Sequence, residues 1–281
     1  MPAALLHGPE VHERDMIASS PRRCGAAHAI AVVAGLVTCS FAASAQVQVK
    51  VLISGGFSGP YEKLLPEFEH TTGMKVVTGS GSSQGSGPQT IAAQLARGVP
   101  ADVVILSREG LTELIGAKRI VAGTDVDLAQ TPIGVAVRAG AAKPDVSTVD
   151  AFKRVLLGAR SIAVPSSTSG IFLMKDVFPR LGIAEKINVK PSPRGKGAAA
   201  MVASGEADVA VMPVSEIMHA PGVDLAGVIA EEIQLHQVFA AAVVAGSKEV
   251  DAAKRLIAFL ASERAAATIR SSGMEPPGKR H

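Results

Sequence analysis

Short apolar runs alternate with amphipathic stretches from residue 47 to residue 270. The run VVIL at 103–106 is apolar on both faces, as a strand covered on both sides of a sheet requires. The pattern predicts strands at 47–54, 74–79, 101–107, 132–140, 161–167, 208–214 and 236–246. It predicts helices at 60–72, 88–97, 109–117, 149–157, 170–181, 196–205 and 248–270. This order predicts an α/β protein with parallel strands and helices on both faces of its sheets.

The first 45 residues have the pattern of a cleavable export signal. Arg22 and Arg23 precede an apolar, Ala-rich stretch that ends in Ala43-Ser44-Ala45, a small-residue cleavage site. Cleavage after Ala45 would leave a mature chain that begins at Gln46. We therefore expect an exported, periplasmic protein with a signal peptide over residues 1–45.

The segment could instead be a membrane anchor, or a lipid could be attached at Cys39. Met16 is an alternative to Met1 as the start of translation. Both cysteines, Cys24 and Cys39, fall within this segment, so the mature chain has no disulfide and no thiol nucleophile. No later apolar run reaches membrane-spanning length without charge, so we expect no membrane insertion of the mature chain.

Charge and histidine spacing exclude several classes of partner. The net charge is +3 and no Lys/Arg block occurs, so nucleic acid is not expected. The mature histidines, His70, His219, His236 and His281, lack metal-ligand spacing. We expect a monomer without metal or cofactor.

Small polar residues recur between a predicted strand and the next helix. The segments are SGGFSGPY (54–61), GSGSSQGSGPQ (79–89), PSSTSG (165–170) and SPRGKG (192–197). Ligands of open α/β sheets bind outside the carboxyl ends of strands, where helix N-termini present unpaired N–H groups. Gly55, Gly56 and Ser167 are therefore candidate contacts to a small anion. The alternative is a set of solvated surface loops.

Nucleotide motifs do not fit the Gly-rich loop. A Walker A motif needs Gly-Lys-Ser/Thr, whereas Pro88, Gln89 and Thr90 follow Gly87. A dinucleotide fingerprint needs G-x-G-x-x-G, whereas Gly79, Gly81 and Gly85 form G-x-G-x-x-x-G.

Three basic residues could approach an anion. Arg194 can bind a carboxylate through two parallel hydrogen bonds, and Lys196 follows it at a predicted helix start. Arg108 follows the predicted strand at 101–107; its alternative role is a salt bridge to Glu109 or Glu113.

The order VKVLISGGFSGPYEKLLPEFEHTTGMKVVTGSGSSQG, then IAAQLARGVPADVVILS, resembles the start of the molybdate-binding-protein family of ABC importers. GIFLMKDVFPRLGI and RGKGAAAMVASGEADVAVMPVSEI resemble its second lobe. The resemblance covers residues 47–272. It implies a type II periplasmic binding-protein fold, in which two crossing strands join two α/β lobes around a ligand cleft.

The resemblance also implies lobe boundaries and ligand contacts. Residues 46–130 plus 240–281 would form lobe 1 and 131–239 lobe 2, with crossings near 129–139 and 236–246. The ligand contacts implied by the match are Ser54 with Ser82 or Ser83 in lobe 1, and Ser169 with Gly195 in lobe 2. The protein would then capture a small oxyanion or carboxylate, for an ABC permease.

Two departures from the family pattern favour a larger anion than molybdate. Pro213 stands where the family has a Tyr, and the loop from Gly79 to Pro88 is longer. A cleft near Arg108, Arg194 and Lys196 would suit a di- or tricarboxylate.

An enzymatic alternative follows from the same resemblance. The sequence is similar to exported isomerases of the aconitate isomerase type, which interconvert cis- and trans-aconitate. Such an enzyme needs a base within hydrogen-bond reach of an allylic proton. Glu216, His236 and Lys196 are the candidates, and the spacing does not choose among them. A third reading, the effector domain of a transcription regulator, would need a helix-turn-helix where the export signal stands. Capture without chemistry is the preferred interpretation of the sequence, and the isomerase is the alternative.

Overall fold

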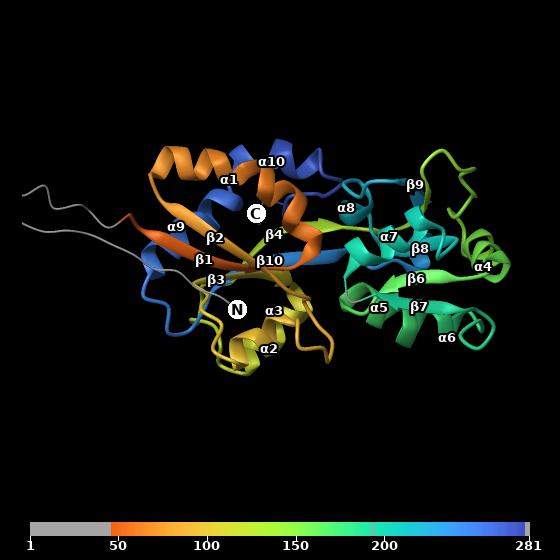
Figure 1. Cartoon of the computed structure of the whole chain (residues 1–281), viewed down its shortest axis with the longest axis horizontal. Helices are drawn as coiled ribbons and strands as arrows, with labels where there is room; N and C mark the ends of the chain where they lie inside the picture. Colours follow the sequence, from red (N-terminus) through yellow and green to blue (C-terminus); the bar gives the residue numbers. More distant parts are fainter. Residues whose placement is uncertain (1–45, 193, 279–281) are drawn as a thin grey trace, which may run out of the picture. The chain divides into compact units, whose positions relative to one another are not determined.

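The computed structural model describes residues 46–192 and 194–278. The expected export signal at 1–45 lies outside them. The described residues belong to one compact unit and contain two five-stranded sheets, each covered by helices (Figure 1). No helix in this part of the chain has the length and apolar character needed to cross a membrane.

The first sheet has the strand order β2-β1-β3-β10-β4. β1 is parallel to β2 and β3, whereas β10 is antiparallel to β3 and β4, so the sheet is mixed rather than parallel throughout. Its strands are β1 (Gln48–Ile53), β2 (Lys75–Ser80), β3 (Val103–Ser107), β4 (Val126–Thr131) and β10 (Gln237–Val243).

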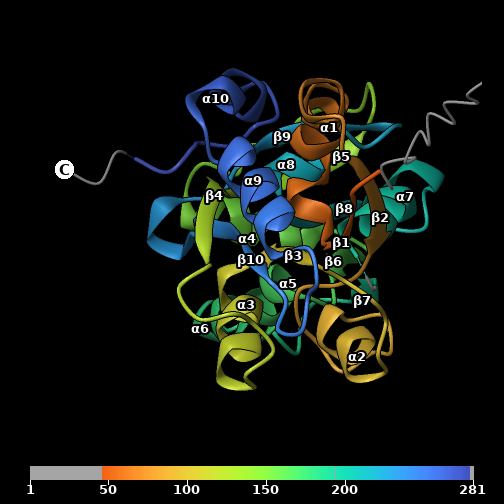
Figure 2. The same cartoon turned by 90° about the vertical axis from the view of Figure 1, so that its left-hand side faces the viewer.

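Helices cover both faces of this first sheet (Figures 1 and 2). One face carries α1 (Ser58–Thr72), which the short η1 (Gly55–Phe57) precedes, with α9 (Val250–Leu260) and α10 (Glu263–Arg270). The other carries α2 (Ile91–Ala96) and α3 (Arg108–Gly116). The central strand β3 is buried on both faces, and its first four residues are accordingly apolar.

The second sheet has the order β7-β6-β8-β5-β9 and is also mixed. β6 is parallel to β7 and β8, and β5 is antiparallel to β8 and β9. Its strands are β5 (Ile133–Arg138), β6 (Ile162–Pro165), β7 (Val189–Ser192), β8 (Val209–Pro213) and β9 (Val223–Val228).

One face of the second sheet packs against α4 (Val149–Gly158) and the continuous helical segment 168–180. That segment consists of α5 (Thr168–Phe172), the π-helix η2 (Leu173–Val177) and α6 (Phe178–Arg180). The opposite face packs against α7 (Gly195–Ser204) and α8 (Val214–Ile217).

The chain passes between the two sheets twice. The first passage is Pro132, between β4 and β5, within the expected range 129–139. The second spans 229–236 and contains η3 (Glu231–Ile233), so it lies earlier than the expected 236–246, which mostly forms β10. We call the first sheet with its helices lobe 1, and the second with its helices lobe 2.

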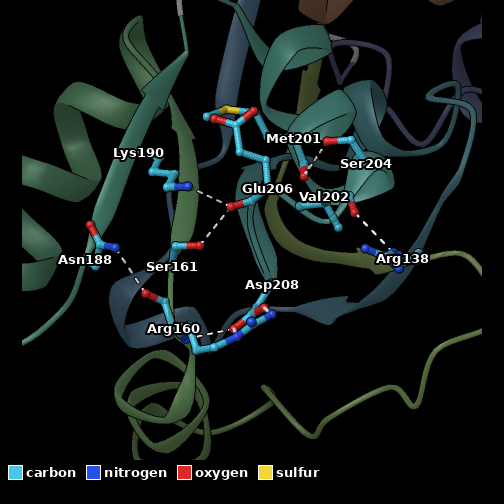
Figure 3. Close-up of polar contacts among 10 residues, drawn as sticks. All are labelled: Arg138, Arg160, Ser161, Asn188, Lys190, Met201, Val202, Ser204, Glu206 and Asp208. Carbon is cyan, nitrogen blue, oxygen red and sulfur yellow. Dashed lines mark hydrogen bonds and ion pairs between the residues drawn. The ribbon is translucent and has the colours of Figure 1, made fainter.

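A polar cluster ties α7 to the amino ends of β6, β7 and β8 (Figure 3). Arg160 donates from its backbone N–H and from Nη2 to the Asp208 carboxylate, at 2.7 and 2.6 Å. The backbone oxygen of Glu206 accepts hydrogen bonds from Ser161 Oγ and Lys190 Nζ, at 3.1 and 2.8 Å. These bonds stabilise the end of lobe 2 that lies away from the carboxyl ends of its strands.

Candidate functional site

A small cavity lies between the two lobes, at the carboxyl ends of their parallel strands. The centre of a water-sized sphere can occupy about 20 Å³ of it, which is room for one or two water molecules, so a larger ligand requires the lobes to open further. The lining residues of the cavity are Ser54, Gly55, Gly56, Gly81, Ser82, Ser83, Pro165, Ser167, Ser169, Arg194, Glu216, Gln237 and Phe239.

Lobe 1 brings two strand ends to the cavity. Ser54 follows β1, and its backbone N–H donates to Ile105 in β3 at 2.8 Å. Ser82 and Ser83 follow β2. A Cβ on Gly56 would lie 1.9 Å from the Phe239 ring, so only glycine lets this backbone approach the ring.

Lobe 2 brings three strand ends to the cavity. Ser167 and Ser169 follow β6, Arg194 follows β7, and Glu216 follows β8. A Cβ on Gly170 would lie 1.6 Å from the backbone oxygen of Pro165, so the first turn of α5 packs directly on the end of β6. This packing places Ser167 and Ser169 at the cavity wall.

Several polar atoms of the cavity lack hydrogen-bond partners. Ser54 Oγ, Arg194 Nε and Gln237 Oε1 are buried and have no partner within residues 46–192 and 194–278. An unsatisfied buried polar group costs about 1–3 kcal/mol. Three of them lining one hollow indicate a site completed by a polar ligand.

Glu216 is the acidic residue among the described lining residues. Its side chain is partly buried, and a Cβ on Gly55 would lie 2.7 Å from its Oε2, so the carboxyl group faces the start of η1 across the lobe boundary. Burial raises its pKa to about 7, and the charge of Arg194 acts in the opposite direction. Glu216 thus exchanges protons near neutral pH, beside a guanidinium.

Nine of the predicted residues lie together in this cavity. They are Ser54, Gly55, Gly56, Ser82, Ser83, Ser167, Ser169, Arg194 and the proposed base Glu216. Gly195 begins α7, immediately after Arg194.

Three predicted residues lie elsewhere. Arg108 donates from Nε to Asp127 and from Nη1 to Asp125, each at 2.8 Å, so its charge is used within lobe 1. His236 pairs with Glu231 at 2.8 Å. Lys196 is exposed on α7 and does not line the cavity. Of the three proposed bases, Glu216 is the one at the cavity wall.

Sequence reasoning missed four lining residues, Gly81, Pro165, Gln237 and Phe239. Gln237 matters most because its side chain is polar and 3% exposed. It opens β10, which runs antiparallel to β3, so the beginning of β10 meets the carboxyl end of β3. No local signal marks this position, since it depends on long-range pairing.

No group of three or more His, Cys, Asp or Glu side chains that could hold a metal occurs in the part of the chain that the structure describes. The chemistry of the cavity is that of hydroxyl, amide, guanidinium and carboxyl groups.

Comparison with known proteins agrees with this architecture. A model of the bacterial extracellular solute-binding protein family matches residues 49–275. An aconitate isomerase of Pseudomonas sp. is 37% identical over 236 residues, which cover 84% of this chain and 90% of that protein.

Solved structures share the fold. The periplasmic molybdate-binding protein of Azotobacter vinelandii has a TM-score of 0.64 and 22% identity, over 82% of this chain and all of that chain. A sulfate-binding protein of Mycobacterium tuberculosis has a TM-score of 0.67 and 20% identity, over 83% of this chain and 88% of that chain. These likenesses confirm the predicted two-lobed periplasmic binding-protein fold. The chain belongs to the bacterial extracellular solute-binding protein family.

Proposed function

We propose that the chain is an exported isomerase that shifts the double bond of a small unsaturated tricarboxylate and so interconverts cis- and trans-aconitate. The observation that carries this proposal is Glu216, a carboxyl group with a pKa of about 7 at the wall of a cavity rich in anion-binding groups. The aconitate isomerase relative supports the same activity.

The cavity suits a carboxylate-bearing ligand. Arg194 can bind a carboxylate in a bidentate manner, and the serine hydroxyls can donate to further carboxylate oxygens. The hydroxyls come from both lobes, so a ligand with several carboxylates would contact both and favour lobe closure.

The reaction needs one proton removed and one returned. A base takes a proton from the methylene carbon next to the double bond, and the electron pair of that C–H bond forms a new double bond to the central carbon. The former double-bond electrons move to the far carbon and its carboxylate, and that carbon then takes a proton. Glu216 is suited to both transfers because its pKa lies near neutral pH. Arg194 and the hydroxyl donors would stabilise the charge on the intermediate.

Capture without chemistry is the second candidate. The family and the interlobe position of the cavity favour it, and its product would be a loaded protein that docks on a permease of an ABC importer. An ionised Glu216 would repel an anionic ligand, however, so a carboxyl group at this position contributes more to proton transfer than to capture.

The test is incubation of the mature chain, residues 46–281, with trans-aconitate, followed by chromatography for the cis form. We expect cis-aconitate to accumulate to equilibrium. Thermal unfolding is measured in parallel with trans-aconitate, citrate, molybdate and sulfate, because ligand at 100 times its Kd adds about 2.7 kcal/mol. Stabilisation without turnover would leave capture as the function. The absence of both stabilisation and turnover would contradict both candidates.

A further inference from the structure

Hydrogen bonds that cross between the lobes lie directly beside the cavity. We propose that Thr168 is a positioning residue: it joins Ser107 and Gln84 of lobe 1 and so holds the hydroxyls of Ser83 and Ser167 as donors towards the ligand. We call Ser107, Thr168 and Gln84 the latch. This inference rests on the proposed function only in taking the cavity as the ligand site.

The latch has a defined direction. Thr168 Oγ1 lies 2.7 Å from Ser107 Oγ and donates to Gln84 Oε1 at 2.8 Å. A threonine hydroxyl carries one hydrogen, so Ser107 must donate in the first of these bonds. Ser107 Oγ in turn accepts from the backbone N–H of Gly110 at 3.2 Å. Ser107 is fully buried and Thr168 is 4% exposed, so water does not compete for these bonds.

The latch residues reach the cavity through their backbone. The N–H of Ser107 donates to Ser83 Oγ at 2.9 Å, and the N–H of Gln84 donates to Ser167 Oγ at 3.3 Å. Both serines line the cavity. The hydroxyl oxygens of Ser83 and Ser167 each accept a hydrogen bond from a backbone N–H. Within residues 46–192 and 194–278, neither hydroxyl donates a hydrogen bond to the protein. Each hydrogen can therefore donate to a ligand oxygen.

The bond to Ser167 crosses the lobe boundary, as do both bonds of Thr168. These three bonds exist only while the lobes are closed. The Ser167 hydroxyl is therefore oriented by Gln84 only when the two lobes close. Loss of the Thr168 hydroxyl removes two of the crossing bonds without removing any group that lines the cavity.

The experiment compares Thr168→Val with two matched variants. Thr168→Ser keeps the hydroxyl at this position. Thr112→Val removes a hydroxyl that donates to the backbone oxygen of Arg108 in its own helix. Binding of trans-aconitate is measured by calorimetry, and turnover by KM and kcat. Thr168→Val should weaken binding about tenfold or more, with KM rising more than kcat falls. Thr168→Ser and Thr112→Val should stay within about threefold of the parent.

Lobe separation is measured independently of any ligand. Residues 46–281 contain no cysteine, so spin labels can be placed at Arg97→Cys in lobe 1 and Lys186→Cys in lobe 2, both exposed. Pulsed electron resonance should give longer label distances in Thr168→Val than in the parent and in Thr112→Val. If Thr168→Val does not fold, Gln84→Leu removes the acceptor of the Thr168 hydroxyl and should lengthen the distances as well.

The outcomes separate this inference from the proposed function. Unchanged label distances in Thr168→Val, or unchanged affinity for a bound trans-aconitate, would overturn the latch whatever the turnover. Longer distances and weaker binding with no turnover by the parent would support the latch and refute the isomerase. If the parent does not bind trans-aconitate, the label distances alone decide.

Discussion

Replacing Glu216 with Gln removes the proposed base while keeping the shape of the side chain. General acid–base catalysis contributes about 10²–10⁴-fold to a rate, so turnover of trans-aconitate should fall at least a hundredfold. Ligand affinity should be kept or increased, because the variant no longer places a negative charge beside the ligand. For the parent protein, kcat should rise with pH around 7, as Glu216 loses its proton.

The same substitution has a predictable effect on stability. Burial raises the pKa of Glu216 from its ordinary 4.5 to about 7 in the folded state. Between these values the folded protein holds a proton that the unfolded chain has released, so the free energy of unfolding falls as pH rises through this window. The pKa shift from 4.5 to about 7 corresponds to a loss of about 3 kcal/mol in the free energy of unfolding. The carboxyl group also contacts the water-accessible cavity, so the expected loss is about 1–3 kcal/mol. Glu216→Gln should abolish this loss.

The assay is urea unfolding at pH 4.5 and pH 8, together with turnover measured by proton NMR. Glu206→Gln is the matched control, because Glu206 is exposed at the opposite end of lobe 2 (Figure 3). The parent and the control should lose more stability than Glu216→Gln between the two pH values. Equal losses in all three proteins would refute the burial argument, and turnover by Glu216→Gln within tenfold of the parent would refute its role as base.

Three further substitutions test the packing of lobe 2 and its Arg160–Asp208 ion pair. Gly170→Ala should destabilise the protein by about 3 kcal/mol and weaken ligand binding, since its Cβ would meet the oxygen of Pro165; wild-type behaviour in thermal melts and calorimetry would contradict this. Phe152→Ala should cost about 3–5 kcal/mol in urea unfolding because the ring is fully buried in lobe 2, and a loss below about 1 kcal/mol would be inconsistent with that core. Asp208→Asn should cost no more than about 1 kcal/mol at pH 7; Arg160 lowers the pKa of Asp208, so the difference should vanish as pH falls through that pKa, and a constant difference would argue against the pairing.

The central strands could be predicted from sequence because they are buried on both faces. The strands expected at 101–107 and 208–214 appear as β3 and β8, which are buried along their whole length. β4, β7 and β9 were not predicted, and all three are sheet edges. Edge strands need less apolar surface and tolerate proline, as Pro191 in β7 illustrates, so hydrophobic pattern alone does not reveal them.

Helix boundaries depended on local signals. The amphipathic pattern at 149–157 matches α4, where Thr148 caps the first turn by accepting from Ala151 N–H. The segment expected as one helix at 248–270 forms two helices, α9 and α10, because residues 261–262 are not helical. Ser262 opens α10 in an extended conformation typical of an N-cap.

The strand-end loops of the site could be predicted, but the partners of its charged groups could not. The Gly- and Ser-rich segments after β1 and β2 converge because carboxyl ends of parallel strands share one edge of a sheet. The segment after β6 belongs to the second sheet and meets them because the strand ends of both lobes line the same cavity. Arg108 pairs with Asp125 and Asp127, which only the fold brings beside it. The raised pKa of Glu216 likewise depends on burial between the lobes, which no spacing in the sequence expresses.

The central claim is that groups from both lobes gather around one carboxylate-bearing ligand, with Glu216 beside it. A crystal structure of Glu216→Gln grown with trans-aconitate tests this directly. The account predicts trans-aconitate in the interlobe cavity, with one carboxylate on Arg194 and another within hydrogen-bond distance of Ser54. Trans-aconitate bound outside that cavity, or an empty cavity at saturating ligand, would contradict it.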